Sequence, residues 1–529
     1  MTDLSLFEQI QKYQECNNAA LYFENKKISY KEMFHRIYQL INYLRSEGIK
    51  HNDVVTVVLP NIPLSIYLFY ALNAIGAKQN IIFPLTPIEN IKQSMKKMSS
   101  SFCILLATQY QDNIQYFNDN NKYFFVNPMF DNSFLLRHIF YLKYKKIKQT
   151  NNIRLIDNYV HYREDKNINS HNPKDDSIYL HSGGTTSTPK VIALSDYAIN
   201  NLANKVNYII PYSLFGKSML AVLPLFHGFG LGMGVHAPLA NNASVGLMMK
   251  FNAKKVIKWI NQNKINLIIG VPELYKRLLN DEAFLNSKLN NLEYCFIGGD
   301  NVNPSLIERF NLEMKNHRSN CMLLEGYGLT ETVTVCSVNT KENFKIGSVG
   351  KMLPNIETII LDDNMNVLKN NEIGELYISG DTLMNGYYLD EHSTNNVFVN
   401  IDNKKYVRTG DLGYIDDDGF IFLKGRKKRM FIISGFNIYP QEIEKLVCSI
   451  NGIKDASLEM FETPKKHLNL YVIKDNEHAI DESILKQSII DLLKKKIIKY
   501  GMPSKIIFID QFPKTRVGKI DHKAFKDED

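Results

Sequence analysis

A loop rich in glycine and hydroxyl side chains is the first stretch of this 529-residue chain whose residue types could do chemistry. Residues 182–190 read Ser-Gly-Gly-Thr-Thr-Ser-Thr-Pro-Lys and follow the apolar residues 178–180. Glycines let backbone N–H groups turn toward an anion, hydroxyls add donors, and Lys190 supplies a point charge for phosphate oxygens. Because the run lacks the Gly-Lys-Ser/Thr of a Walker A motif, it predicts a phosphate loop of another class. A flexible polar loop is the alternative.

Further motifs follow this loop in a fixed order along the chain. They are residues 223–228 (LPLFHG), 298–300 (GGD), 325–331 (EGYGLTE), 406–411 (YVRTGD) and 513–519 (PKTRVGK). In order and spacing they resemble the acyl-adenylate-forming superfamily of acyl-CoA synthetases, luciferases and nonribosomal adenylation domains. The resemblance covers roughly residues 20–525 and is strongest to AMP-forming acyl-CoA synthetases, including long-chain fatty acid CoA ligases, and agreement of so many ordered motifs is far more specific than one motif alone.

The resemblance implies a binding site for Mg·ATP. Tyr327 is expected to stack on adenine, Thr330 to face a phosphate, and Glu331 to bind Mg²⁺ through a hard carboxylate oxygen. Asp411 is expected to accept hydrogen bonds from the ribose hydroxyls, with Arg426 as a second ribose or phosphate contact. The other expected nucleotide-binding residues are Ser182, Gly183, Gly184, Gly298, Gly299, Asp300 and Gly328.

The resemblance also implies the catalytic residues. Lys190, Thr185 and Thr186 are expected to spread the charge of the transferring phosphate, and Lys519 to reach the carboxylate and the α-phosphate from a mobile C-terminal segment. His227 is expected to gate or orient the acid. Each of these residues also has a plain structural interpretation, such as a surface lysine or a polar turn.

Two more residues are expected to serve the second half-reaction, in which a thiol attacks the acyl-adenylate. The family's hinge residue stands two positions after the arginine, which here is Lys428, and rotation there would exchange the adenylating and thioester-forming faces. Gly435 is expected to line the tunnel for the thiol, where a side chain would obstruct it. The neighbouring Arg429 departs from the pattern, because an acid is common at its position.

The acid itself is expected to be apolar. Amino-acid-activating relatives carry an aspartate just after the LPLFHG motif, and residues 227–232 contain none. A buried ammonium without a partner costs several kcal/mol, so a plain carboxylic acid is favoured. The predicted walls of the acyl pocket are Phe226, Phe229, Leu231, Val271 and Pro272, and the predicted room for an extended fatty acyl chain comes from Gly228, Gly230, Gly232 and Gly234.

Three functions remain open on these residues. The favoured one is a ligase that transfers the acyl group to CoA, and the second is a ligase that loads the phosphopantetheine of an acyl-carrier protein. A third is a nucleotide-binding protein without turnover, because Ser187 and Val191 stand where the phosphate loop usually has glycine.

The segments between the motifs predict the scaffold that positions them. Strand-length apolar runs alternate with helical patterns over most of the first 300 residues, which predicts an α/β fold with large doubly wound sheets. After residue 350, short alternating strands predict a small β-rich unit, and the basic run GRKKR precedes an α+β pattern. The predicted organisation is an adenylation domain at 1–424 with a β-rich subdomain at about 345–424, a hinge at 425–429 and a mobile domain at 430–529.

Composition and charge argue against several other classes of protein. The net charge of +8 is spread thinly along the chain, and no basic stripe with aromatic residues predicts nucleic-acid binding. The six cysteines are scattered, which argues against zinc and disulfides, and the first residues do not resemble a secretory signal, so a cytoplasmic location is expected. Residues 134–148 mix apolar and basic side chains and predict either an ordinary basic helix or weak contact with a membrane surface.

Overall fold

The computed structural model describes residues 3–131, 147–182, 190–433, 436–462, 466–475, 480–514 and 520–527. Several predicted features lie outside these ranges. They are Gly183, Gly184, Thr185, Thr186, Ser187, Gly435 and Lys519, together with most of the segment 134–148.

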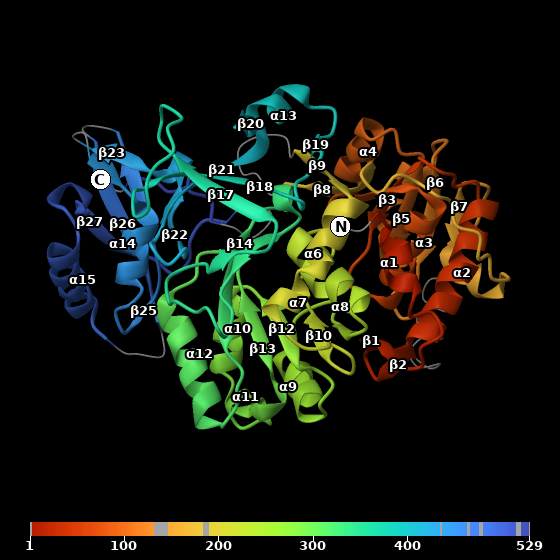
Figure 1. The fold of residues 1–529 in the computed structure, drawn as a ribbon, viewed down its shortest axis with the longest axis horizontal. Helices are drawn as coiled ribbons and strands as arrows, with labels where there is room; N and C mark the ends of the chain where they lie inside the picture. Colours follow the sequence, from red (N-terminus) through yellow and green to blue (C-terminus); the bar gives the residue numbers. More distant parts are fainter. Residues whose placement is uncertain are drawn as a thin grey trace.

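The described residues build two large sheets, both largely parallel, that stand side by side in the first three quarters of the chain (Figure 1). The first has the order β19-β9-β8-β4-β3-β5-β6-β7, and the second has the order β16-β15-β14-β13-β12-β10-β11-β1-β2. The strands of the first are β3 (Val54–Val58), β4 (Lys78–Ile81), β5 (Phe102–Leu106), β6 (Lys122–Val126), β7 (Ile153–Leu155), β8 (Asp176–His181), β9 (Val191–Ser195) and β19 (Gly386–Tyr387). Those of the second are β1 (Ala19–Phe23), β2 (Lys26–Ser29), β10 (Ser218–Ala221), β11 (Ser244–Leu247), β12 (Leu267–Gly270), β13 (Tyr294–Ile297), β14 (Leu323–Gly328), β15 (Val335–Val338) and β16 (Lys351–Met352).

Helices cover both sheets and fill the space between them, which confirms the predicted α/β fold with doubly wound sheets. They are α1 (Leu6–Gln11), α2 (Tyr30–Ser46), α3 (Pro63–Ile75), α4 (Ile88–Lys97), α6 (Asp196–Asn204), α7 (Val206–Ile209), α8 (Ala237–Ala240), α9 (Ala253–Asn261), α10 (Pro272–Leu279), α11 (Glu282–Leu285) and α12 (Pro304–Asn316). A π-helix, η4 (Phe229–His236), was not predicted. Such helices are rare and occur often at functional sites.

Local sequence explains where the central helices begin and end. α3 has proline at its first position, where the missing N–H costs nothing, and ends at Gly76, whose φ of 77° is the left-handed conformation that glycine favours. All its residues are buried, as expected of a helix that is apolar on every side. α2 begins at Tyr30 because the hydroxyl of Ser29 accepts the N–H of Glu32.

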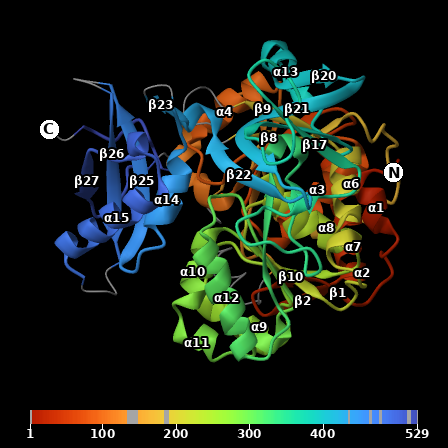
Figure 2. The same ribbon diagram turned by 60° about the vertical axis from the view of Figure 1, so that its left-hand side comes forward.

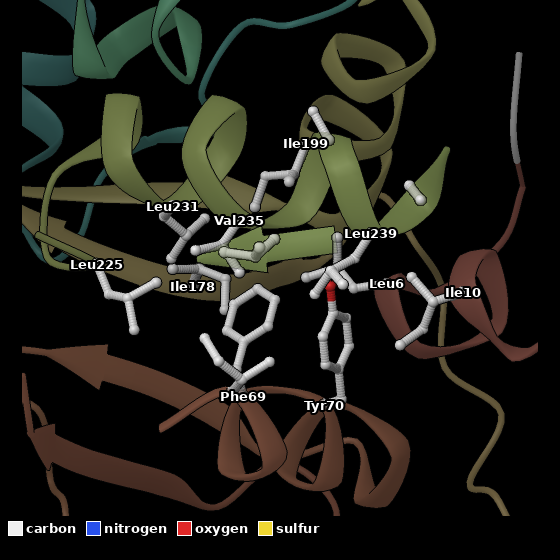
Figure 3. Packing of buried hydrophobic residues seen from close by; sticks show 14 of the residues in the cluster. Leu6, Ile10, Phe69, Tyr70, Ile178, Ile199, Leu225, Leu231, Val235 and Leu239 are labelled. Atoms are coloured by element: carbon white, nitrogen blue, oxygen red, sulfur yellow. The ribbon is translucent and has the colours of Figure 1, made fainter. Parts of the chain in front are cut away.

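The main core lies where the helices of the two sheets meet. Figure 3 shows Phe69 and Tyr70 of α3 below Leu231 and Val235 of η4 and Leu239 of α8. Each of these residues is buried, so the two layers share one continuous apolar core. The predicted pocket residue Leu231 therefore belongs to this core.

A smaller antiparallel sheet follows the two large ones. Its strands are β17 (Ile356–Leu361), β18 (Gly374–Gly380), β20 (Phe398–Ile401), β21 (Lys404–Ile415) and β22 (Ile421–Arg426), with helix α13 (Glu391–Val397) beside it. β22 pairs with β21, so that Arg426 lies directly opposite Asp411.

The last part of the chain has a core of its own and lies at one side of the molecule, next to α12 and β22 (Figures 1 and 2). Its elements are β23 (Phe431–Ile433), β24 (Phe436–Ile438), α14 (Pro440–Val447), β25 (Ile453–Phe461), β26 (His467–Lys474), α15 (Glu482–Lys496) and β27 (Lys505–Phe508). We call the described residues from 430 onward the C-terminal unit. Among the described residues, no helix has the length and apolar character required to cross a bilayer.

Candidate active site

The sequence motifs meet at the carboxyl ends of neighbouring parallel strands of the second sheet. β10, β12, β13 and β14 pair in parallel, and the motifs at 223–228, 298–300 and 325–331 follow or end β10, β13 and β14. In open α/β sheets this edge is where ligands bind. Here it borders a cleft of 2750 Å³ whose lining also includes Ser182, Lys190, Arg426 and Lys428.

Two residues of the cleft lining, Tyr327 and Arg426, hold the buried carboxylate of Asp411. Tyr327 Oη donates to Asp411 Oδ2 at 2.5 Å, and Arg426 Nε lies 2.9 Å from Asp411 Oδ1. Arg426 Nη1 also donates to the carbonyl of Thr409, whose hydroxyl accepts the N–H of Asp411. Burial raises the pKa of Asp411, although Arg426 and the Tyr327 hydroxyl act in the opposite direction. The carboxylate is therefore fixed in position, and its remaining lone pairs can accept hydroxyl donors.

Another part of the cleft joins a lysine, a tyrosine and a glutamate. Lys190 Nζ lies 4.4 Å from the ring centre of Tyr387, and Tyr387 Oη donates to Glu331 Oε1 at 2.9 Å. Burial, followed by the neighbouring Glu331, raises the pKa of Tyr387, so its hydroxyl stays a donor. Thr330 begins the short helix η6 (Thr330–Thr332) beside Glu331 and also lines the cleft. The ring of Tyr387 thus contacts both the ammonium of Lys190 and the carboxylate of Glu331.

Tyr387 is a residue that sequence reasoning missed. It lies on β19, a strand of two residues that pairs with β9, and the N–H of Met384 donates to the carbonyl of Glu331 at 2.8 Å. The only signal in the sequence was a pair of tyrosines after Gly386, which carries no pattern of its own.

The ends of the predicted phosphate loop are joined to each other. Ser182 N–H donates to the carbonyl of Lys190 at 2.9 Å, and Lys190 N–H donates to Ser182 Oγ at 3.0 Å. Residues 183–189, which include four predicted site residues, lie outside the described part of the chain.

The glycine motifs bring backbone close to backbone. A β-carbon on Gly328 would lie 1.4 Å from the carbonyl oxygen of Thr334, so no other residue fits there. Gly299 has a φ of 79° and, with the exposed Asp300, turns the chain after β13 at the edge of the cleft. Gly298 donates its N–H to the carbonyl of Gly270 at 3.2 Å.

His227 stands at the entrance of the π-helix. Its carbonyl accepts the N–H of Leu231, its ring centre lies 4.6 Å from that of Phe226, and its side chain lines the cleft. The next residue, Gly228, packs so tightly that a β-carbon would lie 1.8 Å from the carbonyl oxygen of Val333. Val333 has a φ of 65° and a ψ of −57°, a strained conformation for a β-branched residue. Strain of this kind concentrates at functional sites.

The apolar side of the cleft differs from the predicted one. Phe229, Val271 and Pro272 line it as expected, but Leu231 is buried in the core, and the half-buried Phe226 packs against that core without lining the cleft. The predicted space beside the four glycines is also absent. Gly230 packs against the carbonyl of Pro224, Gly232 against Leu202, and Gly234 against Ile269, because the close approach of the π-helix to its neighbours takes up that space.

The deep end of the apolar side is formed by Ile209, Met233 and Phe296. The same three residues also line a separate small cavity of about 10 Å³, which has room for roughly one water molecule. They therefore stand between the cleft and that cavity.

A buried carboxyl group begins the motif at 325–331. Glu325 on β14 is 7% exposed, and burial raises its pKa to about 7, while Lys445 of α14 acts in the opposite direction. The folded protein thus keeps a proton that the unfolded chain releases near pH 4.5, so the free energy of unfolding falls as pH rises from about 4.5 to 7.

We expect Glu325→Gln to remove this pH dependence. Relative to wild type, the variant should gain about 3 kcal/mol of stability between pH 4.5 and pH 8, since one pKa unit corresponds to 1.36 kcal/mol. Melting temperatures of both proteins over this pH range measure the gap. The exposed Glu308→Gln is the control, and a gap that stays constant with pH would contradict the assignment.

Known protein families match this chain over most of its length. The sequence profile of the AMP-binding enzyme family matches residues 7–388, and that of the AMP-binding enzyme C-terminal domain matches residues 442–519. A probable 4-coumarate–CoA ligase 3 of Dictyostelium discoideum is 27% identical over 509 residues, which cover 92% of this chain and 87% of the relative. A long-chain-fatty-acid–CoA ligase of Escherichia coli O6:H1 is 29% identical over 366 residues, 67% of this chain and 62% of the relative.

Solved structures share the fold over nearly the whole chain. The anthranilate CoA ligase AuaEII in complex with anthranoyl-AMP superimposes with a TM-score of 0.84 at 18% identity, covering 98% of this chain and 95% of that one. At this identity the likeness establishes the fold alone.

Proposed function

Because this chain belongs to the AMP-binding enzyme family, we propose that its cleft joins an apolar carboxylic acid to a thiol in two steps. The chain is an AMP-forming acid–thiol ligase that uses ATP, in keeping with its family and its CoA ligase relatives. One observation carries the assignment of the cleft. Lys190 and Glu331, the apolar Met233, and Arg426, which pairs with Asp411, all border the same space.

In the first step a carboxylate oxygen attacks the α-phosphate of ATP, and the bond to the β-phosphate breaks to give acyl-AMP and pyrophosphate. Lys190 offsets the negative charge that develops there, and Lys519, with Thr185 and Thr186, is proposed to do the same. Asp411 and Arg426 hold the ribose, while the ring of Tyr327 lies beside the adenine. His227 orients the acid.

Magnesium fits the donors on the wall that carries Lys190. Mg²⁺ prefers oxygen ligands and usually binds one or two carboxylates together with substrate phosphates and water. Glu331 offers such a carboxylate, which Tyr387 holds in place, and Thr330 offers a hydroxyl. When bound, the ion would neutralise phosphate charge.

In the second step a thiol sulfur attacks the carbonyl carbon of acyl-AMP, its proton passes to solvent, and AMP leaves with the electron pair of the broken C–O bond. We propose CoA as the thiol, with the phosphopantetheine of a carrier protein as the alternative. Rotation at Lys428 is proposed to bring Gly435 to the thiol tunnel. No side chain of the enzyme needs to act as a nucleophile.

The acyl group is proposed to be apolar and to enter beside Phe229. The deep end consists of Ile209, Met233 and Phe296, and none of these carries a charge that could pair with an ammonium. A short straight-chain or an aryl acid is proposed to lie beside these residues, and the flexible side chain of Met233 is proposed to shift when a longer fatty acid enters. A fatty acid therefore stays a prediction, and the coumarate ligase relatives favour an aryl acid equally.

Release of pyrophosphate with a panel of straight-chain, aryl and amino acids, with and without CoA, tests the proposal. We expect an apolar acid to trigger release and CoA to stimulate it. Release without CoA stimulation would favour a carrier protein as the acceptor, and preference for an amino acid would contradict the apolar pocket. If no acid triggered pyrophosphate release, the enzymatic assignment would be overturned and a nucleotide-binding protein without turnover would be favoured.

A further inference from the structure

The basic run GRKKR at 425–429 precedes the C-terminal unit. Its side chains form ion pairs both with that unit and with the part of the chain before it. Arg426 pairs with Asp411, and Lys427 Nζ lies 2.7 Å from Asp363 Oδ1 and 2.9 Å from Glu375 Oε2. These carboxylates belong to the small antiparallel sheet and its loops. The first two cations of the run are therefore tied to the part of the chain that precedes the junction.

Arg429 is tied to the other part. Its Nη2 donates to Glu444 Oε1 of α14 at 2.8 Å and lies 3.5 Å from Glu459 Oε1 of β25. Both carboxylate side chains are only 8% exposed. Glu444 Oε1 also accepts the N–H of Leu458, so Arg429 joins the two elements at the centre of the C-terminal unit.

The carboxylate of Glu459 continues this chain of contacts toward the end of the protein. It accepts Ser457 Oγ at 2.6 Å and lies 2.7 Å from Nδ1 of His522. His522 stands just after the closed base of the segment that carries Lys519. Lys514 and Ile520 form an isolated bridge there, and the N–H of Asp521 donates to the carbonyl of Pro513 at 2.8 Å.

Lys428 lies between the two sets of partners. It is exposed, and within the described residues no hydrogen bond or ion pair of its side chain is found. The ion pairs thus divide the run GRKKR at this one residue.

On the basis of the proposed function, we propose that Arg429 is a positioning residue for adenylation. It fixes the C-terminal side of the hinge to Glu444 and Glu459, and Glu459 in turn fixes His522 at the base of the Lys519 segment. Hinge and segment therefore turn as one body about Lys428. Loss of Arg429 should loosen the delivery of Lys519 while leaving the thiol-transfer step, which does not use Lys519, nearly unchanged.

The two half-reactions, measured separately, test this role. Single-turnover pyrophosphate release reports adenylation, and thioester formation from synthetic acyl-AMP and CoA reports transfer. We expect Arg429→Ala to slow adenylation about 10- to 100-fold, as a misplaced catalytic group does, and to change transfer by no more than about twofold. Arg429→Lys, which keeps the charge, should recover most of the adenylation rate. The matched control is Arg154→Ala, which breaks the ion pair of Arg154 on β7 with Glu47, the residue after α2.

A double-mutant cycle tests the connection to His522. If the contacts act as one chain, the variant with both Arg429→Ala and His522→Ala should be within about twofold of the slower single variant in adenylation. Effects that multiply, or a transfer rate that falls as much as the adenylation rate, would overturn the proposal. Wild type without pyrophosphate release would instead refute the proposed function, whereas active wild type with unaffected variants refutes only the role of Arg429.

Discussion

Replacing Lys519 by alanine is expected to slow pyrophosphate release by roughly 10²- to 10³-fold, the loss seen when one preorganised donor to a developing charge is removed. The reason is that the side chain is proposed to stabilise charge shared by the carboxylate and the α-phosphate only while they react. Transfer of the acyl group from synthetic acyl-AMP to CoA should be nearly unaffected. Single-turnover measurement of each step distinguishes the two effects.

The matched control is Lys523→Ala, which removes an exposed lysine from the same end of the chain. Both variants lose one positive charge, so a general electrostatic effect would slow them equally. An equal loss in both variants, or an equal loss of both half-reactions in Lys519→Ala, would contradict the assigned role.

The second large effect is expected at Glu331. Glutamine at this position keeps the size and the acceptor for Tyr387 Oη but removes the charge that a magnesium ion prefers. We expect adenylation to fall about 10²-fold at fixed Mg²⁺, as for loss of a group that acts on the transferring phosphate, and to recover partly as Mg²⁺ is raised. The rate of pyrophosphate release, measured over a range of Mg²⁺ concentrations, gives both the loss at fixed Mg²⁺ and the recovery at higher Mg²⁺.

Glu357→Gln serves as the control, since Glu357 is exposed and pairs with Lys404 on the small antiparallel sheet. A magnesium titration curve that superimposes on that of wild type would show that Glu331 does not bind the ion.

Much of the site could be read from the sequence because its chemistry follows strands. The apolar run Tyr294–Ile297 has the length of a buried strand and is β13, and the glycines after it lie at the carboxyl edge of the sheet as α/β layering requires. Asp411 and Tyr327 were assigned separately, from motifs 84 residues apart, and the fold joins them by a hydrogen bond. Local pattern sufficed to place residues that lie at the end of their own strand.

Roles that depend on packing between distant segments could not be read in this way. Tyr387 reaches Glu331 and Lys190 only because the two-residue strand β19 pairs with β9. The four glycines after His227 suggested open space, but their missing side chains allow the π-helix to approach Val333, Pro224 and Ile269. Arg429 appeared only as a departure from the family pattern, since neither Glu444 nor Glu459 is near it in sequence.

The ion pairs on either side of Lys428 also affect the conformational entropy that the proposed rotation of the C-terminal unit would cost. Between Lys427, which is anchored to Asp363 and Glu375, and Arg429, which is anchored to Glu444, the free chain is one residue long. Under the rotation proposed at Lys428, only the two backbone torsion angles of that residue have to be selected for each orientation of the C-terminal unit. Ordering one residue costs about 1–2 kcal/mol, whereas a loosely held linker of five residues would cost several times as much at every turnover.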